Sequence, residues 1–413
     1  MKQMDLFNHV TSAYTSASDG VLTNEALYRA VAERAGIDIK DMEATIPVGK
    51  AGTQRSPIKR AVRWFQQDLR AAGVIEKVPD ARGVWRLTEG AGRKLSKSLG
   101  GVKMVAFSTN LGVAIWGSNQ SVFPHSSEPV MLAISSPPYP LRCARAYGNV
   151  NEQEYVDFVV RSLEPVVKNL APEGSVVLNV SQDIFMNRSP ARSTYNERLV
   201  LAICDRLGLH LMDRFVWHNA SKPPGPIQWA SKERVQVNVA YEPIYWFAAD
   251  PLRVNANNQR VLQPHTARHA ALIARGGEQR EGIFSDGAYR IKHGSFGSPT
   301  AGAIPRNVLS LGHQCADSAA HRRHARELGF TTHGAPFPSS IPSFFIRFLT
   351  EVGQLVVDMF AGTHKAALVA ERLGRRWMTT ENVLDYIRPS AELFRTFPGF
   401  ENNPGLEQVR GSL

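Results

Sequence analysis

A short apolar run that ends in Ser136-Pro137-Pro138-Tyr139 constrains the fold of this chain more than any other feature of its sequence. The run, Val130 to Ile134, has the length and composition of a buried strand. The two prolines cannot donate backbone hydrogen bonds, so strand pairing stops there and nearby carbonyl groups are free to accept from a ligand. Because ligands of open α/β sheets bind at the carboxyl ends of the strands, the tetrapeptide is predicted to form a binding edge. The alternative is an ordinary turn, in which Pro-Pro-aromatic sequences also occur.

A second pattern, much later in the chain, predicts a strand, a tight turn, a helix and another strand. The apolar run from Leu355 reaches the turn at Gly362, and a helix is expected from about His364 to Leu373. The next strand, Trp377 to Thr380, ends at Glu381. An acidic residue about 20 positions past a glycine turn is placed to bind ribose hydroxyls. The alternative is a βαβ unit of a parallel sheet that binds no ligand.

The length and composition of the chain limit the class of protein to which it can belong. With 413 residues it is expected to form two or three domains, and 43% hydrophobic residues can build a sizeable core. No stretch is long and apolar enough to cross a membrane, and the first residues lack a signal-peptide pattern. The three widely spaced cysteines favour a reducing cytoplasm over a disulfide framework. We therefore expect a cytoplasmic protein with no membrane partner.

The charge of the chain points to a polyanionic partner. The formal net charge is +11, and the basic residues are mixed through the predicted helices rather than gathered in a tail. Such a balance favours binding to nucleic acid. The alternative is a charge that serves only solubility.

Residues 1–98 are predicted to form a separate winged-helix module. Three helices are expected at residues 4–17, at 24–35 with Gly36 as the stop, and from Ser56-Pro57 to Gly73. Residues 74–78 and 84–87 then flank a turn and indicate a hairpin. The candidate contacts to DNA phosphates are Lys59, Arg63, Arg70 and Arg82. The alternative is a solvated basic face on a module that binds another protein.

Gly100-Gly101 marks the expected linker to a region in which strands and helices alternate. A helix over 152–170 is expected to be interrupted at Pro165, and the turn Pro172-Glu173-Gly174 to lead into a strand over 175–180. A helix over 194–207 and strands over 209–217 and 241–248 follow. From residue 250 to about 332 this order is lost, and Gly, Pro, Asn, Arg and His are frequent. A long irregular insert in a compact domain is usually functional.

The order of the two motifs, with Ser136-Pro137-Pro138-Tyr139 first and Asp358-Met359-Phe360-Ala361-Gly362 last, resembles the beta-class amino-methyltransferases of DNA. A variable basic segment lies between the motifs in both. The Ser-Pro-Pro-aromatic form is similar to the N4-cytosine subgroup, and the resemblance is strongest to its PvuII-type members. It covers about residues 105–395 and includes these further stretches: Ala146-Tyr147-Gly148-Asn149, Pro190-Ala191-Arg192-Ser193, Trp217-His218-Asn219, Gly302-Ala303-Ile304-Pro305-Arg306-Asn307, Ala335-Pro336-Phe337-Pro338 and Phe344-Phe345-Ile346-Arg347.

The resemblance implies an α/β fold with a Rossmann-like methyltransferase sheet and permuted motif order. Its parts are a catalytic half at 102–249, a target-recognition region at 250–332, an S-adenosylmethionine-binding half at 333–400 and a tail at 401–413. The implied cofactor is S-adenosylmethionine, and the implied partner is double-stranded DNA, with a cognate restriction endonuclease as a further candidate. The N-terminal module lies outside this match and resembles the winged-helix segments of restriction-associated proteins.

The resemblance also assigns roles to individual residues. Ser136, Pro137, Pro138 and Tyr139 are the implied catalytic residues. The implied cofactor-binding residues are Asp358, Phe360, Gly362, Thr363, Glu381, Pro336 and Phe337. Arg192 and Arg234 are added as candidate DNA contacts, although an exposed charge with no ligand is an equal alternative for Arg234.

Two positions depart from the family pattern. His364 stands where the family's turn usually has glycine or asparagine, so its β-carbon limits close approach to the cofactor unless the side chain points away. Asn179 stands where related enzymes can carry an acid, which leaves the proton acceptor unassigned. Two rival functions therefore stay open: an adenine N6 methyltransferase, and a non-catalytic DNA-binding protein whose cofactor pocket has decayed at His364.

The chemistry of amine methylation is consistent with this residue set. The exocyclic amine attacks the methyl group itself, so no covalent adduct is needed, whereas C5 methylation needs a nucleophilic cysteine. None of the three cysteines follows a proline in a turn. Zinc sites could be drawn with His265 and His269, or with His321, His324 and Cys315, but paired Cys-x-x-Cys spacing is missing and no metal is expected.

Overall fold

A ten-stranded mixed sheet forms the centre of the computed structural model. The structure describes residues 21–48, 52–71, 75–79, 81–87, 103–140 and 152–407, together with His9, Val10, Ala13, Tyr14 and Ala17. The strands of the sheet, in spatial order, are β14 (Val308–Ser310), β10 (His210–His218), β11 (Tyr241–Ala248), β9 (Leu170–Asn179), β8 (Val130–Ser135), β15 (Leu355–Asp358), β16 (Arg376–Glu381), β7 (Gly112–Gly117), β6 (Lys103–Ser108) and β17 (Glu401–Asn402). Strands β9, β8, β15, β16 and β7 run parallel at its centre.

The permuted chain order brings the two sequence motifs together. Strand β8 ends at Ser135, directly before Ser136, and it pairs in parallel with β15, whose Val356 lies opposite Leu132. Strand β15 pairs in parallel with β16, which ends at Glu381. The carboxyl ends of these three strands therefore meet at one edge of the sheet, which confirms the predicted Rossmann-like arrangement.

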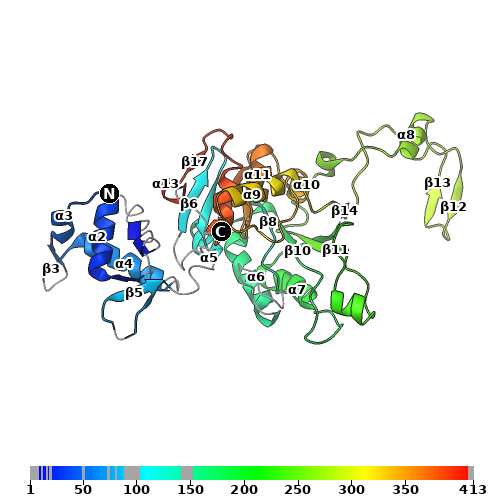
Figure 1. Ribbon diagram of the computed structural model, residues 1–413. Helices are drawn as coiled ribbons and strands as arrows, with labels where there is room; N and C mark the ends of the chain where they lie inside the picture. The colour runs from blue at the N-terminus through cyan, green and yellow to red at the C-terminus, as the bar shows by residue number, and fades with distance from the viewer. Residues whose placement is uncertain are drawn as a thin grey trace.

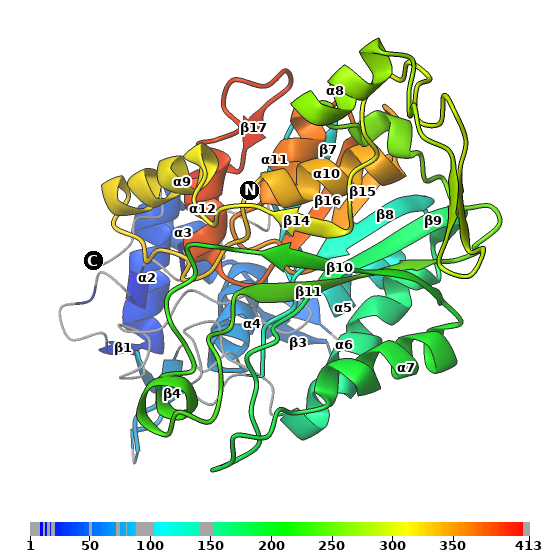
Figure 2. The same cartoon turned by 90° about the vertical axis from the view of Figure 1, so that its right-hand side faces the viewer.

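Helices cover both faces of the sheet (Figure 2). Helices α6 (Glu152–Val167) and α7 (Tyr195–Leu207) pack on one face around Ala133, Val176 and Val357. Helices α10 (Ser340–Leu349), α11 (Lys365–Arg372) and α12 (Leu384–Ala391) pack on the other around Leu132, Val177 and Val356. Because successive strand residues point to opposite faces, each strand contributes to both cores. Shorter elements are α5 (Asn119–Val122) and η1 (Phe123–His125) after β7, and α13 (Pro404–Glu407) near the end of the chain.

Two details of the catalytic half differ from the sequence prediction. Helix α6 continues through Pro165 to Val167, so the expected interruption is wrong. The expected turn Pro172-Glu173-Gly174 lies inside strand β9, where pairing with β8 jumps from Leu170 opposite Val130 to Ser175 opposite Leu132. The proline and glycine mark a bulge in a strand rather than a boundary between elements.

The region 250–332 is less irregular than predicted. Strand β14 extends the main sheet through parallel pairing with β10. Helix α9 (Ala316–Glu327) packs beside α12, where His321 Nε2 lies 3.0 Å from the carbonyl oxygen of Tyr386. The segment between β11 and β14 contains η3 (Asn258–Val261), α8 (Ala267–Ala274) and the hairpin of β12 (Gly282–Phe284) and β13 (Tyr289–Ile291). Helix α8 and the hairpin project away from the sheet (Figure 1).

The N-terminal part has most of the expected elements. Helix α2 (Asn24–Ala35) is capped by Thr23 and ends at Gly36 with a left-handed backbone, and α4 (Pro57–Ala71) follows Ser56. Strands β4 (Ile75–Lys77) and β5 (Val84–Leu87) form the predicted hairpin, to which β1 (Val21–Thr23) adds a third strand. Helix α3 (Ile39–Glu43) and the hairpin of β2 (Ile46–Val48) and β3 (Thr53–Arg55) were not predicted. Most of the expected first helix, Gly73 and the stretch Ala146 to Asn149 lie outside the described residues. Among the helices that the structure describes, none has the length and apolarity needed to span a bilayer.

Candidate active site

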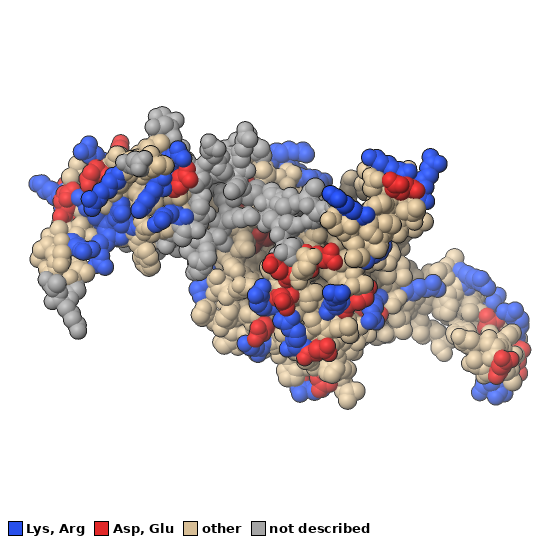
Figure 3. All heavy atoms as spheres, turned by 90° about the horizontal axis from the view of Figure 1, so that it is seen from below, with Lys and Arg blue, Asp and Glu red and all other residues tan. Residues whose placement is uncertain are grey.

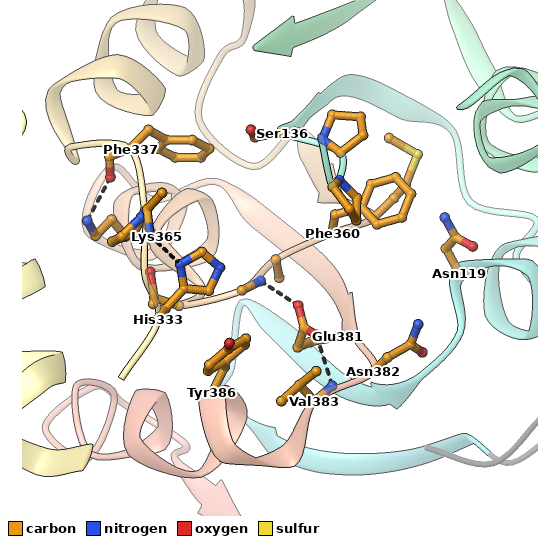
Figure 4. Close-up of a pocket in the computed structure, with 18 of the residues that line it drawn as sticks. Asn119, Ser136, His333, Phe337, Phe360, Lys365, Glu381, Asn382, Val383 and Tyr386 are labelled. Atoms are coloured by element: carbon orange, nitrogen blue, oxygen red, sulfur yellow. Dashed lines mark hydrogen bonds between the residues drawn. The ribbon is translucent and has the colours of Figure 1, made fainter. Parts of the chain in front are cut away.

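A cavity of about 330 Å³ lies where strands β8, β15 and β16 end (Figure 4). Its volume falls within the range of roughly 300–1,000 Å³ that is usual for small-molecule sites. Ten of the predicted site residues line it: Ser136, Pro137, Pro138, Tyr139, Pro336, Phe337, Phe360, Gly362, Thr363 and Glu381. Sequence reasoning missed several further lining residues, among them Asn119, His333, Lys365, Asn382, Val383 and Tyr386.

Asp358 does not take the place predicted for it. The carboxyl group is buried between the ends of β8 and β15, where it accepts hydrogen bonds from Ser135 Oγ at 2.5 Å and from the Phe360 amide at 3.1 Å. Burial raises the pKa of Asp358 to about 7, although these hydrogen bonds act in the opposite direction. Asp358 thus supports the loop that follows β15 instead of forming the wall of the cavity.

Glu381 joins the two loops beside the cavity. Its Oε2 accepts from the Gly362 amide at 2.7 Å, and its Oε1 accepts from the Val383 amide at 2.9 Å. Gly362 has a φ of 51°, and a β-carbon there would lie 3.1 Å from His333 Nε2. The left-handed backbone favours glycine at this turn, and a β-carbon there would be in tight contact with the His333 ring.

The side chain of His364 points away from the cavity. The residue has a left-handed backbone with φ of 54°, and its ring is fully buried 5.5 Å from the ring of Phe107. Burial lowers the pKa of His364 to about 3, so the imidazole is neutral in the core. The neighbouring Thr363 and Lys365 do line the cavity. The departure at His364 changes the packing behind the turn rather than the surface of the cavity.

Lys365 fixes the segment that carries Pro336 and Phe337, two of the implied cofactor-binding residues. Its ammonium group donates to the Phe337 carbonyl oxygen at 2.6 Å and to the Ser318 hydroxyl. The side chain is buried, and burial lowers the pKa of Lys365. Because Lys365 opens helix α11, it ties the segment around Phe337 to the βαβ unit.

Polar side chains beyond Ser136 form a connected group. Ser136 Oγ lies 3.2 Å from Tyr139 Oη. The Tyr139 hydroxyl lies within donating distance of Asn179 Oδ1, at 3.3 Å, and of Glu242 Oε2, at 3.1 Å. Burial, followed by the nearby Glu242 carboxylate, raises the pKa of Tyr139 well above its ordinary value.

Glu242 is the acidic residue that sequence reasoning missed. It lies near the start of β11, which pairs with β9 so that Ile244 is opposite Asn179. Lys222 Nζ lies 3.4 Å from its Oε1. A carboxylate ahead of the apolar run of β11 is visible in the sequence, but its contact with Tyr139 depends on the pairing of β11 with β9.

The candidate DNA-binding residues fall into two groups. Lys59 is paired with Glu43 at 2.7 Å, Arg63 is half-buried, and Arg192 donates to the Gln182 carbonyl oxygen at 2.5 Å. Arg70, Arg82 and Arg234 are exposed. Figure 3 shows further Lys and Arg side chains over the N-terminal part and along the projecting segment. The exposed group is the one available for phosphate contacts.

The histidine clusters make contacts other than metal ligation. His265 packs 4.8 Å from His269, and its Nε2 is 3.0 Å from the Thr300 hydroxyl. His324 Nδ1 is 3.2 Å from Glu327. Over the part of the chain that the structure describes, no group of three or more His, Cys, Asp or Glu side chains could hold a metal ion.

The mixed sheet, its parallel centre and the cavity at the strand ends define an α/β protein with the methyltransferase fold. The solved structure of PvuII DNA methyltransferase (cytosine-N4-specific) superimposes with a TM-score of 0.55 and 29% identity, covering 73% of this chain and 90% of that one.

Sequence comparison identifies the family. The model of the DNA methylase family matches residues 130–392, and the chain belongs to this family. Type II methyltransferase M.PvuII of Proteus hauseri is 32% identical over 313 residues, which are 74% of this chain and 89% of the relative. Type II methyltransferase M.BglII of Bacillus subtilis is 23% identical over 290 residues, 68% of each chain. Residues 12–98 match the model of the Mrr N-terminal domain.

Proposed function

We propose that this protein is a site-specific DNA methyltransferase that transfers a methyl group from S-adenosylmethionine to the N4 amine of cytosine in double-stranded DNA. The observation that carries the proposal is the position of Ser136 in the wall of the cavity, directly after the strand that pairs with the βαβ unit. Membership of the DNA methylase family and the similarity to the cytosine-N4-specific PvuII enzyme support the same chemistry.

The residues around the cavity fit S-adenosylmethionine. The Glu381 carboxylate is suited to the ribose hydroxyls, and the apolar side chains of Phe360 and Val383 are suited to the adenine ring. Gly362 lines the cavity with backbone alone, because it has no side chain. Bound there, S-adenosylmethionine supplies the methyl group and takes up the electron pair of its own carbon–sulfur bond.

Ser136 and its neighbours are assigned to the target base. The cytosine amine must lose the delocalisation of its lone pair into the ring before it can attack. Ser136 Oγ and the Pro137 carbonyl oxygen can accept from the amine hydrogens and so orient the lone pair toward the methyl group. The base reaches this site only after it leaves the duplex, and the ring of Tyr139 offers it a stacking surface.

The buried position of His364 counts against a decayed cofactor pocket. Its side chain lies against Phe107 in the core, whereas Gly362 and Thr363 keep their places on the cavity wall. The turn after β15 therefore still presents Gly362 and Thr363 to the cavity, which supports a pocket able to bind the cofactor.

The test is methylation of a DNA library with S-adenosylmethionine, followed by nuclease digestion and mass spectrometry of the nucleosides. We expect N4-methylcytosine. N6-methyladenine would make the protein an adenine methyltransferase. The absence of any product, together with no heat of cofactor binding in calorimetry, would support the non-catalytic alternative.

We also propose a division of the chain in DNA binding. Residues 1–98 would contact phosphates as a winged-helix module, and the projecting segment within 250–332 would contact bases. The supporting observations are the exposed Arg70 and Arg82 and the basic side chains on the projecting segment. A restriction endonuclease that reads the same sequence is a proposed partner in the cell.

A further inference from the structure

Two side chains, those of Ser136 and Tyr139, link the cavity to the Glu242 carboxylate, which does not line it. Ser136 Oγ is 3.2 Å from Tyr139 Oη, and Tyr139 Oη is 3.1 Å from Glu242 Oε2. The other carboxylate oxygen of Glu242 is 3.4 Å from Lys222 Nζ. Ser136 and Tyr139 come from the segment directly after β8, and Glu242 comes from the start of β11, so only the folded sheet brings the three groups together.

The hydrogen bonds in this group have a defined direction. Tyr139 keeps its proton because burial raises its pKa well above the ordinary value, so it donates to the carboxylate of Glu242. The Ser136 hydroxyl then donates to Tyr139 Oη. This leaves the lone pairs of Ser136 Oγ available to accept a hydrogen from a bound amine.

Amine methylation needs an outlet for one proton. The nitrogen starts with two hydrogens, gains a bond to carbon and ends with one hydrogen. Asn179, at the end of β9, carries an amide that cannot serve as the acceptor, although it lies 3.4 Å from Glu242 Oε2 through Nδ2. The carboxylate of Glu242 is hydrogen-bonded to both Tyr139 and Asn179.

We propose that Glu242 is the terminal proton acceptor of a relay that runs from the target amine through Ser136 and Tyr139, an inference that rests on the proposed function. The amine proton passes to Ser136 Oγ as the Ser136 hydroxyl proton passes to Tyr139 Oη. The Tyr139 proton passes at the same time to Glu242 Oε2. One proton leaves the nitrogen, one arrives on the carboxylate, and both hydroxyl groups end as they began.

The position of Glu242 allows the proton to leave the site. About a fifth of its side chain is exposed, with a value of 19%, so the carboxyl group can pass the proton to water between turnovers. Glu242 acts through Tyr139 and touches neither the base nor the cofactor cavity, so it is a positioning residue for proton transfer.

The first test is single-turnover methylation by Glu242→Gln, with cofactor and DNA affinities measured by titration. We expect the rate to fall by roughly 10²-fold, the lower end of the usual range for general acid–base catalysis, with both affinities little changed. Glu173→Gln is the matched control, because Glu173 lies on the adjacent β9 and pairs with Arg253 at 2.5 Å far along the strand. Its rate should equal that of the wild type.

The second test separates a relay from a structural role. In Tyr139→Phe the relay is already broken, so adding Glu242→Gln should lower the rate little further. In Glu242→Ala, added formate should restore part of the rate, because a small carboxylate can occupy the vacated position. A variant whose rate is low because the protein is misfolded would not respond to formate in this way.

The outcomes are distinct. Wild-type rates in Glu242→Gln, or independent rate reductions in the double variant together with no formate rescue, would overturn the relay while leaving the proposed function in place. A wild-type protein that methylates no DNA amine would overturn both.

Discussion

The backbone amide of Gly362 donates a 2.7 Å hydrogen bond to the carboxylate of Glu381. This bond joins the turn after β15 to the end of β16. The other oxygen of Glu381 holds the Val383 amide at 2.9 Å, so one carboxylate organises both loops at the cavity. A residue predicted from spacing to bind ribose hydroxyls therefore also shapes the site in which they would lie.

Replacing Glu381 with alanine should weaken S-adenosylmethionine binding by well over tenfold. Each charge-assisted hydrogen bond to a ribose hydroxyl contributes roughly 1.5–3 kcal/mol. Isothermal titration calorimetry measures the change. Glu381→Gln serves as the control, since its amide oxygen can still accept from one backbone amide, and it should bind the cofactor with intermediate affinity. Equal affinity in wild type and Glu381→Ala would mean that the βαβ unit has only a structural role.

Ser136→Ala should lower the methylation rate by roughly 10²–10³-fold, because the variant lacks the hydroxyl that accepts one of the amine hydrogens and takes the first step of proton transfer. Cofactor affinity should stay close to that of the wild type. Radiolabelled methyl transfer at saturating DNA gives the rate, and calorimetry gives the affinity. Undiminished turnover would remove Ser136 from the catalytic assignment.

The buried carboxyl group of Asp358 should make stability depend on pH. Burial raises the pKa of Asp358 to about 7 in the folded chain, well above its value in the unfolded chain. Between about pH 4 and pH 7 the unfolded chain loses this proton while the folded chain keeps it, so stability falls as pH rises and then levels off. In the wild type this loss of stability should be on the order of 4 kcal/mol, since one pKa unit corresponds to ~1.4 kcal/mol. In Asp358→Asn, which has no carboxyl group to ionise, the loss should be absent.

Urea unfolding of wild type and Asp358→Asn across this pH range measures the effect. The control is Asp317→Asn, for which the sign is opposite. Burial works to raise the pKa of Asp317, but hydrogen bonds from Arg372 and Ser339 lower it overall. Asp317 should therefore stabilise the fold at neutral pH and lose this effect on acidification. If the free energies of unfolding of the wild type and of Asp358→Asn differ by the same amount at every pH, the prediction is wrong.

The sequence predicted the strands and turns of the site because their signals are local. The apolar run before Ser136 and the βαβ pattern ending at Glu381 each lie within one short stretch, and parallel strands bring their carboxyl ends to one edge. These stretches, with the segment around Phe337, supplied ten of the residues on the cavity wall.

The features that sequence reasoning missed depend on contacts between distant parts of the chain. Asp358 lies buried between two strand ends, where Ser135 on the neighbouring strand donates a hydrogen bond to its carboxyl group. Glu242 reaches Tyr139 only through the pairing of β11 with β9. Strand β14 has three residues and little periodicity of its own, so its place in the sheet could not be read before its pairing with β10 was known.

The exposed arginines of the N-terminal part should contribute affinity without sequence information. In the full chain, Arg70→Gln combined with Arg82→Gln should reduce the salt slope of DNA binding by roughly two units, about one for each phosphate that the variant no longer neutralises. The methylated sequence should not change, because phosphate contacts do not discriminate between bases. Fluorescence anisotropy over a salt series gives the slope, and methylation-site sequencing gives the specificity.

Arg86→Gln provides the matched control. Arg86 lies on β5, shortly after Arg82, but it is paired with Glu76 at 2.7 Å. Its slope should equal that of the wild type. A chain that begins at Lys103 should still methylate the same sequence, with weaker binding and a shallower slope than the double variant. If that truncation changes which sequence is modified, the N-terminal module reads bases and the proposed division of the chain is wrong. If the truncation leaves both the DNA affinity and the salt slope unchanged, the basic face of the N-terminal module is only solvated, and the module binds another protein.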